Sequence, residues 1–266
     1  MRVIFIGDVM GEIGQTMLTT YLPKLKSKYR PQLTIVNGEN IASGKGITRP
    51  LYKLILQAGA DVVTMGNHTF DKQEIFEFID EAKKLVRPAN YPAATTPGQG
   101  YTLVKINQVV VGVINLQGRV FINPIDDPFA KADELVKQLQ DKCDLIFVDF
   151  HAETTSEKLA MAWYLDGRVA AVIGTHTHVQ TNDARILPKG TAYLTDAGMT
   201  GPYNEILGMN KDRVIEKFRT NLPVRFETPK SGPGQLNGCY FELDEKTGRA
   251  RKLQPFSINP DRPFLE

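Results

Sequence analysis

Residues 169–178 read VAAVIGTHTH: an apolar run, a glycine, and two histidines separated by one threonine. The apolar run is short and rich in small and β-branched residues, which predicts a buried β-strand over residues 169–173. Gly174 permits an unusual backbone angle after that strand, and His176 and His178 follow directly. The same arrangement, an apolar run that ends in polar side chains, recurs four more times along the chain. This recurring arrangement predicts both the fold class and the location of the functional site.

Short apolar runs alternate with longer amphipathic segments, which predicts an α/β fold with a largely parallel core sheet. The expected strands are residues 3–6, 33–36, 61–65, 109–114, 145–150 and 169–173. The expected helices are residues 15–28, 50–58, 72–85, 130–140, 156–164 and 212–220. Residues 238–243 and 249–256 alternate in character and predict antiparallel strands. No linker interrupts the pattern, so we expect one domain over residues 1–266.

The composition is that of an ordinary globular protein, with 42% hydrophobic and 23% charged residues among 266. A net charge of +2 provides no basic stripe for a nucleic-acid backbone, so we expect no stable nucleic-acid binding. Two cysteines cannot form a disulfide framework, which predicts a reducing, cytoplasmic location. No apolar run approaches the ~20 residues of a membrane span, so no membrane association is expected. We also expect a homo-oligomer.

Polar side chains gather where the predicted strands end. They are Asp8, Glu39, Asn40, Asn67, His68, His151, His176 and His178, a set that includes every histidine of the chain. In open α/β sheets, ligands bind outside the carboxyl ends of the strands. The sequence therefore predicts that five strand ends deliver these side chains to one edge.

Oxygen and imidazole donors without thiolates favour manganese, iron or zinc in a reactive site over a structural zinc site. Six or seven donors are too many for one tetrahedral ion but suit two, with Glu39 as a bridge between ions ~3.5–4 Å apart. His176 and His178 are two residues apart, so in an extended segment they would project from one face and bind one ion each. Such a pair lowers the pKa of a bound water, and the hydroxide can then attack phosphorus.

Each of these motifs, taken alone, can also be explained by a structural role. Gly66-Asn67 alone is a turn signal, Asp8 alone could cap the following helix, and His151 alone could be a hydrogen-bonded core residue. The His176-x-His178 pair is different, because two buried imidazoles side by side are costly without a metal or other partners. Taken together, the four histidines at strand ends favour a metal site.

Three cations near these motifs could contact a substrate phosphate: Lys45, Arg49 and Arg119. For the two residues of the 40–49 loop a solvated charge is the competing explanation, and for Arg119 it is a structural ion pair. The Gly44-Lys45-Gly46 sequence lacks the spacing and the following Ser or Thr of a phosphate-binding P-loop.

Eight stretches define a more specific pattern. They are FIGDV (5–9), NGEN (37–40), TMGNH (64–68), INLQGR (114–119), DFHAE (149–153), GTHTHVQ (174–180), TDAGMTGP (195–202) and TNLPVRF (220–226). Together they resemble the calcineurin-like metallophosphoesterases and, more closely, the YmdB-type bacterial phosphodiesterases. The resemblance covers nearly the whole chain.

This resemblance implies a calcineurin-like metallophosphoesterase fold, that is, a β-sandwich core flanked by helices. It also implies a dinuclear site and phosphodiesterase activity on 2′,3′- and/or 3′,5′-cyclic nucleotides. One ion would be bound by Asp8, Glu39, Asn40 and His178, and the other by Glu39, Asn67, His151 and His176. His68 would bind no metal; it would lie over the substrate and donate to the phosphate or protonate the leaving oxygen.

Two motifs depart from the wider superfamily. Met10 replaces the histidine of its Asp-x-His motif, and Gly38-Glu39-Asn40 replaces its Gly-Asp-x-x-Asp motif; the YmdB-type branch shows both changes. The first ion then has an oxygen-rich site, which favours manganese or iron over zinc. The expected substrate is a cyclic nucleotide or another small phosphodiester. The alternatives are a phosphomonoesterase or nucleotidase, and a metal-binding regulatory protein with vestigial activity.

Overall fold

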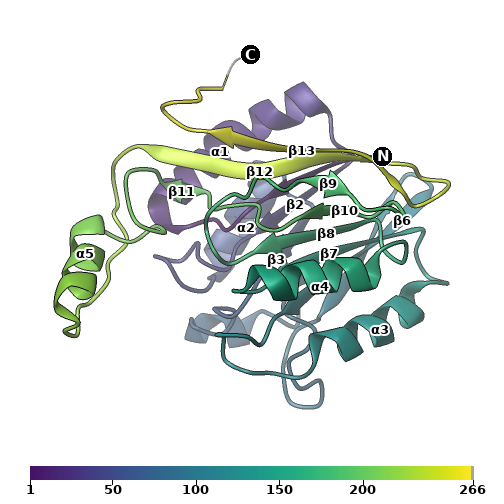
Figure 1. Cartoon of the computed structure of the whole chain (residues 1–266), viewed down its shortest axis with the longest axis horizontal. Helices are drawn as coiled ribbons and strands as arrows, with labels where there is room; N and C mark the ends of the chain where they lie inside the picture. The colour runs from purple at the N-terminus through teal and green to yellow at the C-terminus, as the bar shows by residue number, and fades with distance from the viewer. Residues whose placement is uncertain (265–266) are drawn as a thin grey trace.

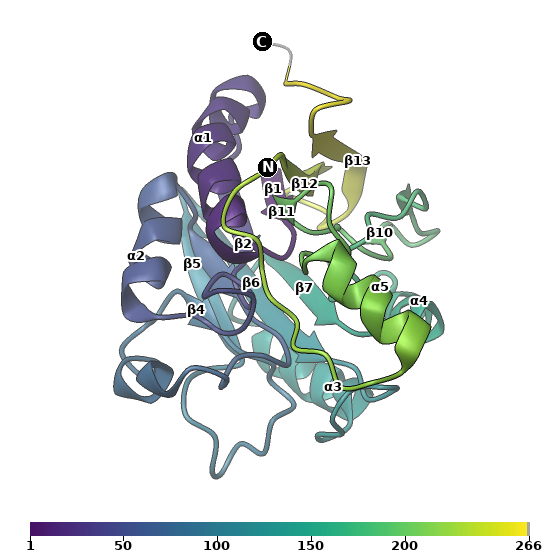
Figure 2. The same ribbon diagram turned by 90° about the vertical axis from the view of Figure 1, so that its left-hand side faces the viewer.

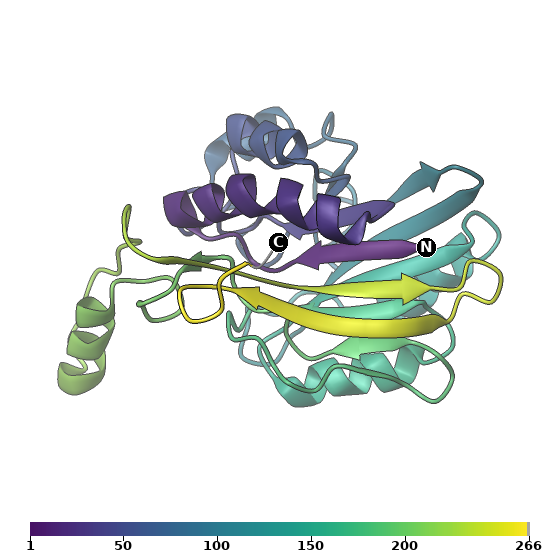
Figure 3. The same cartoon turned by 90° about the horizontal axis from the view of Figure 1, so that it is seen from above.

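Two β-sheets lie face to face in the computed structural model of this protein, which describes residues 1–264 (Figures 1 and 3). The first sheet has the order β11-β12-β1-β2-β3-β4, with β13 paired to β12. Its strands are β1 (Arg2–Ile6), β2 (Leu33–Asn37), β3 (Val62–Thr64), β4 (Leu85–Val86), β11 (Gly201–Pro202), β12 (Gly234–Leu243) and β13 (Ala250–Ile258). The second sheet has the order β5-β6-β7-β8-β10-β9. Its strands are β5 (Tyr101–Ile106), β6 (Val109–Gln117), β7 (Leu145–His151), β8 (Ala171–Thr175), β9 (Arg185–Ile186) and β10 (Ala192–Leu194).

Alternation along β1 shows how the sequence produces these layers. Successive side chains of a strand point to opposite faces, so Val3 and Phe5 join the core between the sheets, while Ile4 and Ile6 join the core beneath the helices. Phe5 packs against Phe147 of the second sheet with ring centroids 5.4 Å apart. Both faces of the strand are therefore buried, which explains its continuous apolar run.

Helices cover the outer face of each sheet. α1 (Gly11–Tyr29) and α2 (Arg49–Ala58) pack on the first sheet, and α3 (Pro128–Leu139) and α4 (Thr155–Leu165) pack on the second. α5 (Lys211–Thr220) stands away from the main body (Figures 1 and 3). Among the described residues, no helix is both long enough and apolar enough to cross a membrane.

The fold class predicted from the sequence is confirmed, and so is the helix-flanked sandwich that the resemblance implied. The expectation of one largely parallel sheet is wrong, because the parallel strands fall into two sets. β1 to β4 pair in parallel in the first sheet, and β6, β7, β8 and β10 do so in the second. The predicted antiparallel tail is confirmed: β12 pairs with β1 and β13 with β12, both antiparallel.

The helix predicted over residues 72–85 is also wrong. Only a short 3-10 helix, η1 (Gln73–Glu77), forms there, and successive turns lead to β4. Ile75, Phe78, Ile79 and Ala82 are all buried, at a spacing that resembles one face of a helix. Because Leu85 and Val86 must enter the edge of the sheet, the chain packs these apolar side chains through separate turns.

Candidate metal centre

The strand-end residues named above meet at one edge of the two sheets, where the parallel strands point toward the viewer in Figure 2. Asp8 follows β1, Glu39 and Asn40 follow β2, and Asn67 and His68 follow β3, all in the first sheet. His151 is the last residue of β7, and His176 and His178 follow β8, in the second sheet. The site is therefore shared between the sheets.

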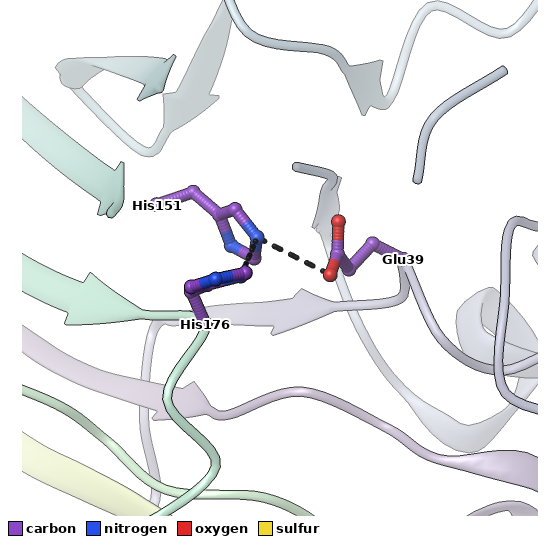
Figure 4. Close-up of side chains that lie close together, drawn as sticks. All are labelled: Glu39, His151 and His176. Atoms are coloured by element: carbon purple, nitrogen blue, oxygen red, sulfur yellow. Dashed lines mark hydrogen bonds and ion pairs between the residues drawn. The ribbon is translucent and has the colours of Figure 1, made fainter. Parts of the chain in front are cut away.

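Glu39, His151 and His176 form the tightest cluster (Figure 4). His151 Nε2 lies 3.2 Å from Glu39 Oε1 and 3.1 Å from His176 Nδ1. Asn67 Oδ1 joins them, 2.9 Å from His151 Nε2. One atom from each member of the trio lies within 4.8 Å of the others, a spacing at which they could hold a metal ion.

A second group lies beside this cluster. His178 Nε2 approaches Asn40 Oδ1 at 3.3 Å, and Asp8 Oδ2 accepts a hydrogen bond from the His176 main-chain N–H at 3.2 Å. Asp8 does not cap the following helix: the N-cap of α1 is Met10, which makes no side-chain cap bond. The seven strand-end residues expected to bind metal thus lie in two adjoining groups.

The rings of His151, His176 and His178 are each oriented by an acceptor on the side that faces away from the site. The Leu207 carbonyl lies 3.0 Å from His178 Nδ1, and the Glu153 carboxylate lies 2.9 Å from His176 Nε2. A carbonyl and a carboxylate can only accept, so these ring nitrogens carry the protons and the opposite nitrogens face inward without one. His151 Nδ1 faces the Thr175 hydroxyl, which itself donates to Asp149, so Nε2 is the atom that His151 presents to the site.

The His176–His178 segment differs from the extended geometry expected from the sequence. His176 has φ 99° and His178 has φ 65°, both in the left-handed region. Between them, Thr177 donates its main-chain N–H and its hydroxyl to Asp196, at 3.0 and 2.7 Å. Asp196 is buried and paired with Lys158, also buried, at 2.7 Å. A strained turn fixed by a buried ion pair, rather than strand alternation, sends the two rings to different partners.

Burial and charge act against each other on the ionisable groups. Burial alone would raise the pKa of Glu39, but the nearby charge of His151 prevails and lowers that pKa to about 2. Burial alone would lower the pKa of His151, but Glu39, Asp8 and Asp149 raise it to about 9. In the metal-free protein His151 is therefore a cation paired with Glu39.

For His176 and Asp8, burial has the largest effect on the pKa. Burial and the nearby charge of His151 lower the pKa of His176 to about 3, which keeps that ring neutral. Burial raises the pKa of Asp8, since desolvation disfavours its charged form. A cation bound beside Asp8 would offset this cost.

Two buried carboxylate oxygens indicate whether the site suits a metal ion. Asp8 Oδ1 and Glu39 Oε1 accept no hydrogen bond, although buried polar atoms nearly always do. Each faces a nitrogen of His151, at 3.8 and 3.2 Å. Gly66 lies against Glu39 and His151, and a Cβ atom there would lie 2.3 Å from Glu39 Oε2. Such oxygens, set among imidazole nitrogens, fit a divalent cation.

His68 lies apart from the clustered donors, and its expected role at the substrate stays a prediction. Its main-chain N–H donates to Glu39 Oε2 at 3.0 Å, while its Nδ1 faces Asp71 Oδ2 at 2.7 Å. Its neighbour Asn67 turns instead to His151. Adjacent residues therefore contribute to the site in different ways, and the Nε2 atom of His68 remains available to a ligand.

Two of the cations considered from the sequence have other partners. Arg49 pairs with Glu81 at 3.2 Å, and Arg119 faces Asp127 at 3.6 Å. Four residues that orient the donors were not predicted from the sequence: Glu153, Thr175, Lys158 and Asp196. Glu153, Thr175 and Asp196 stand inside three of the motifs quoted above, whereas Lys158 stands outside all of them, and this is the only signal that the sequence offered.

Comparison with known proteins gives consistent matches. The family model described as YmdB-like protein matches residues 4–256. The 2′,3′-cyclic-nucleotide 2′-phosphodiesterase of Bacillus subtilis (strain 168) is 58% identical over 266 residues, which cover 100% of both chains. The crystal structure of a novel phosphatase from Mycoplasma pneumoniae superposes with a TM-score of 0.91 at 41% identity, over 97% of this chain and 93% of that one. A putative 5′-nucleotidase from Staphylococcus aureus shares the fold, with a TM-score of 0.63 at 15% identity, over 98% of this chain and 57% of that one.

Proposed function

The chain belongs to the YmdB-like protein family, and from this premise we propose that it is a phosphodiesterase that hydrolyses cyclic nucleotides with two divalent metal ions. The relative from Bacillus subtilis, whose name gives this activity on 2′,3′-cyclic nucleotides, aligns over its full length. One observation carries the proposal: donor side chains from two sheets converge on buried carboxylate oxygens that accept no hydrogen bond.

We assign the donors to two ions that share Glu39. The Asn40–His178 contact and the neighbouring Asp8 support one ion bound by Asp8, Glu39, Asn40 and His178. The cluster around His151 supports the other, bound by Glu39, Asn67, His151 and His176. Iron or manganese suits this oxygen-rich set, with zinc as the alternative. Elemental analysis of the purified protein would identify the ions, and an ion-to-chain ratio near two is expected.

Two bound divalent ions would supply a water of lowered pKa and a positive field for the phosphoryl oxygens. The chain itself holds Glu39 in place through the main-chain N–H of His68 and through His151. Asp71 fixes the ring of His68 by accepting from Nδ1, so a proton on Nε2 can pass to the oxygen that leaves phosphorus. Cleavage of a cyclic ester then yields a monoester and a free hydroxyl.

The test is hydrolysis of 2′,3′-cyclic AMP by manganese-loaded protein and by Glu39→Gln. The substitution removes the shared carboxylate with little change in shape, so turnover should fall by more than roughly 100-fold, the upper range for partners that only support a metal ligand. Glu216→Gln is the matched control, because Glu216 lies on α5 in an exposed pair with Arg213. Equal rates in wild type and Glu39→Gln would contradict the proposal.

A second candidate activity, on phosphate monoesters, is favoured by the name of the Mycoplasma pneumoniae structure, which is a phosphatase. Comparison of kcat/KM for 2′,3′-cyclic AMP, 3′,5′-cyclic AMP and 3′-AMP separates the two activities. We expect a cyclic diester to be preferred. Faster turnover of 3′-AMP than of either diester would favour the monoesterase.

We retain two further predictions, a cytoplasmic location and a homo-oligomer. Both cysteines are free, as a reducing compartment requires. Ile215 and Phe218 expose apolar surface on the projecting α5, and a second copy could cover it. Light scattering of the purified protein measures the oligomeric state directly, and a mass near 30 kDa would contradict the oligomer.

A further inference from the structure

Glu153 makes a contact that the proposed mechanism leaves unused. It lies two residues beyond the end of β7, and its Oε2 atom is 2.9 Å from His176 Nε2. His176 follows β8, so this contact joins the ends of two neighbouring strands. The Glu153 side chain is 45% exposed, whereas the His176 side chain is only 19% exposed. The carboxylate therefore reaches from the solvent side onto the back of a donor in the site.

This contact determines which atom His176 presents to the site. A carboxylate can only accept, so Nε2 carries the proton and Nδ1 is left with a lone pair. Nδ1 is the atom that faces His151 Nε2, at 3.1 Å, within the Glu39 cluster. Without Glu153 the ring could place its proton on either nitrogen or rotate about its side-chain bonds. Either change would remove the inward lone pair.

Among the groups within hydrogen-bond distance of the outer ring nitrogens of His151, His176 and His178, Glu153 alone is charged. His151 faces the hydroxyl of Thr175, and His178 faces the main-chain carbonyl of Leu207. A carboxylate on the outer nitrogen increases the basicity of the inner one and fixes the ring orientation, which strengthens a metal–imidazole bond.

We propose that Glu153 is a positioning residue for one of the two ions, the one assigned to Glu39, Asn67, His151 and His176. The proposal rests on the proposed function, because it requires that His176 binds a metal. The ion assigned to Asp8, Glu39, Asn40 and His178 should be insensitive to Glu153, since the His178 ring is held by a backbone carbonyl instead.

The competing explanation is an ordinary surface contact. Exposed pairs typically contribute little to folding and have no defined effect on a ligand. The two explanations differ in what they change. A surface contact would slightly alter the stability of the metal-free protein, whereas a positioning residue alters the affinity for one ion and leaves the other unchanged.

The experiment is a calorimetric titration of Mn²⁺ into metal-free wild type, Glu153→Ala and Glu153→Gln. Glu153→Ala should weaken one of the two binding events by about 10- to 100-fold and leave the second unchanged. Glu153→Gln keeps an acceptor oxygen without the charge and should fall between wild type and Glu153→Ala. Glu216→Ala, at a side chain that is 48% exposed, is the matched control and should bind as wild type does. Asn40→Ala should weaken the other event instead.

Kinetics at saturating Mn²⁺ provide a second readout. An excess of the ion should restore most of the kcat of Glu153→Ala with KM for 2′,3′-cyclic AMP unchanged, because only metal affinity is impaired. Two wild-type-like binding events in Glu153→Ala would overturn this inference and leave the proposed function standing. A wild-type protein that binds no Mn²⁺, Fe²⁺ or Zn²⁺ would overturn both.

Discussion

Neighbouring side chains at the third strand end, those of Asn67 and His68, contact different partners. Asn67 turns inward to His151, while His68 contacts Glu39 only through its backbone and keeps its ring toward Asp71. The resemblance implied such a difference, with Asn67 as a metal ligand and His68 as a residue that binds no metal. The roles of the two residues themselves remain predictions.

Removal of the His68 ring gives a test at this scale. Leaving alkoxides require a proton, so His68→Ala should lower kcat for 2′,3′-cyclic AMP by about 10²- to 10⁴-fold. A bis(4-nitrophenyl) phosphodiester has a leaving group that needs no proton, and its turnover should change much less. Elemental analysis should find the metal content unchanged. Equal losses on both substrates would assign His68 to phosphate binding rather than to proton transfer.

Asp8 provides a second test, on stability. Its buried Oδ1 atom accepts no hydrogen bond, and burial disfavours its charge. Asp8→Asn removes that charge, so the metal-free protein should gain about 1–3 kcal/mol in unfolding free energy, measured by urea denaturation. The variant should bind one ion more weakly and lose activity. A metal-free variant less stable than wild type would show that Asp8 supports the fold without a metal.

At the scale of elements, the left-handed turn after β8 depends on a buried ion pair. Lys158 of α4 reaches Asp196, and Asp196 accepts both polar hydrogens of Thr177. The turn between His176 and His178 is thereby fixed to a helix as well as to a strand. Buried pairs of this kind are costly to break from one side, since the remaining charge has no partner.

Lys158→Met should therefore destabilise the protein by about 3–5 kcal/mol, measured by chemical denaturation. The double variant with Asp196→Asn also removes the unpaired charge of Asp196, so it should recover part of the lost stability. Its metal affinity should still be reduced, because the amide holds Thr177 less firmly. If the double variant binds Mn²⁺ as wild type does, the pair serves the fold alone.

Elements that bury both faces were predictable, and the individual residues that orient the donors were not. Continuous apolar runs revealed β1, β2 and β7, whereas the two-residue strands β4, β9 and β11 have too little sequence to form a pattern. The helical spacing of apolar residues between 75 and 82 indicated a helix where the chain forms turns. Glu153 was missed as a functional residue because its partner lies 23 positions further on, at the end of another strand.

For the molecule as a whole, the division of the site between two sheets is the main feature. Glu39 and Asn67 follow strands of the first sheet, and His151 and His176 lie at the ends of strands of the second. A bound ion would link the two sheets and favour the folded state over the unfolded one. By linkage, an ion present at about 100 times its dissociation constant adds about 2.7 kcal/mol to stability.

Removal of the metal tests whether a bound ion links the two sheets and stabilises the fold. Dialysis against a chelator should lower the melting temperature, and Mn²⁺ should restore it in a concentration-dependent way. Glu39→Gln should show a much smaller response, because both ions lose a ligand. A melting temperature that does not depend on Mn²⁺ in the wild type would contradict the link between the sheets.

Phe5 and Phe147, packed between the sheets, have a consequence that reaches beyond folding. A substitution that shifts one sheet against the other by even a fraction of an ångström would move donor atoms that must meet at a common ion. Natural selection would then act on this interior through catalysis as well as through stability. Across the history of the family, the residues between the sheets should accordingly diverge more slowly than those beneath the outer helices, although both are equally hidden from water.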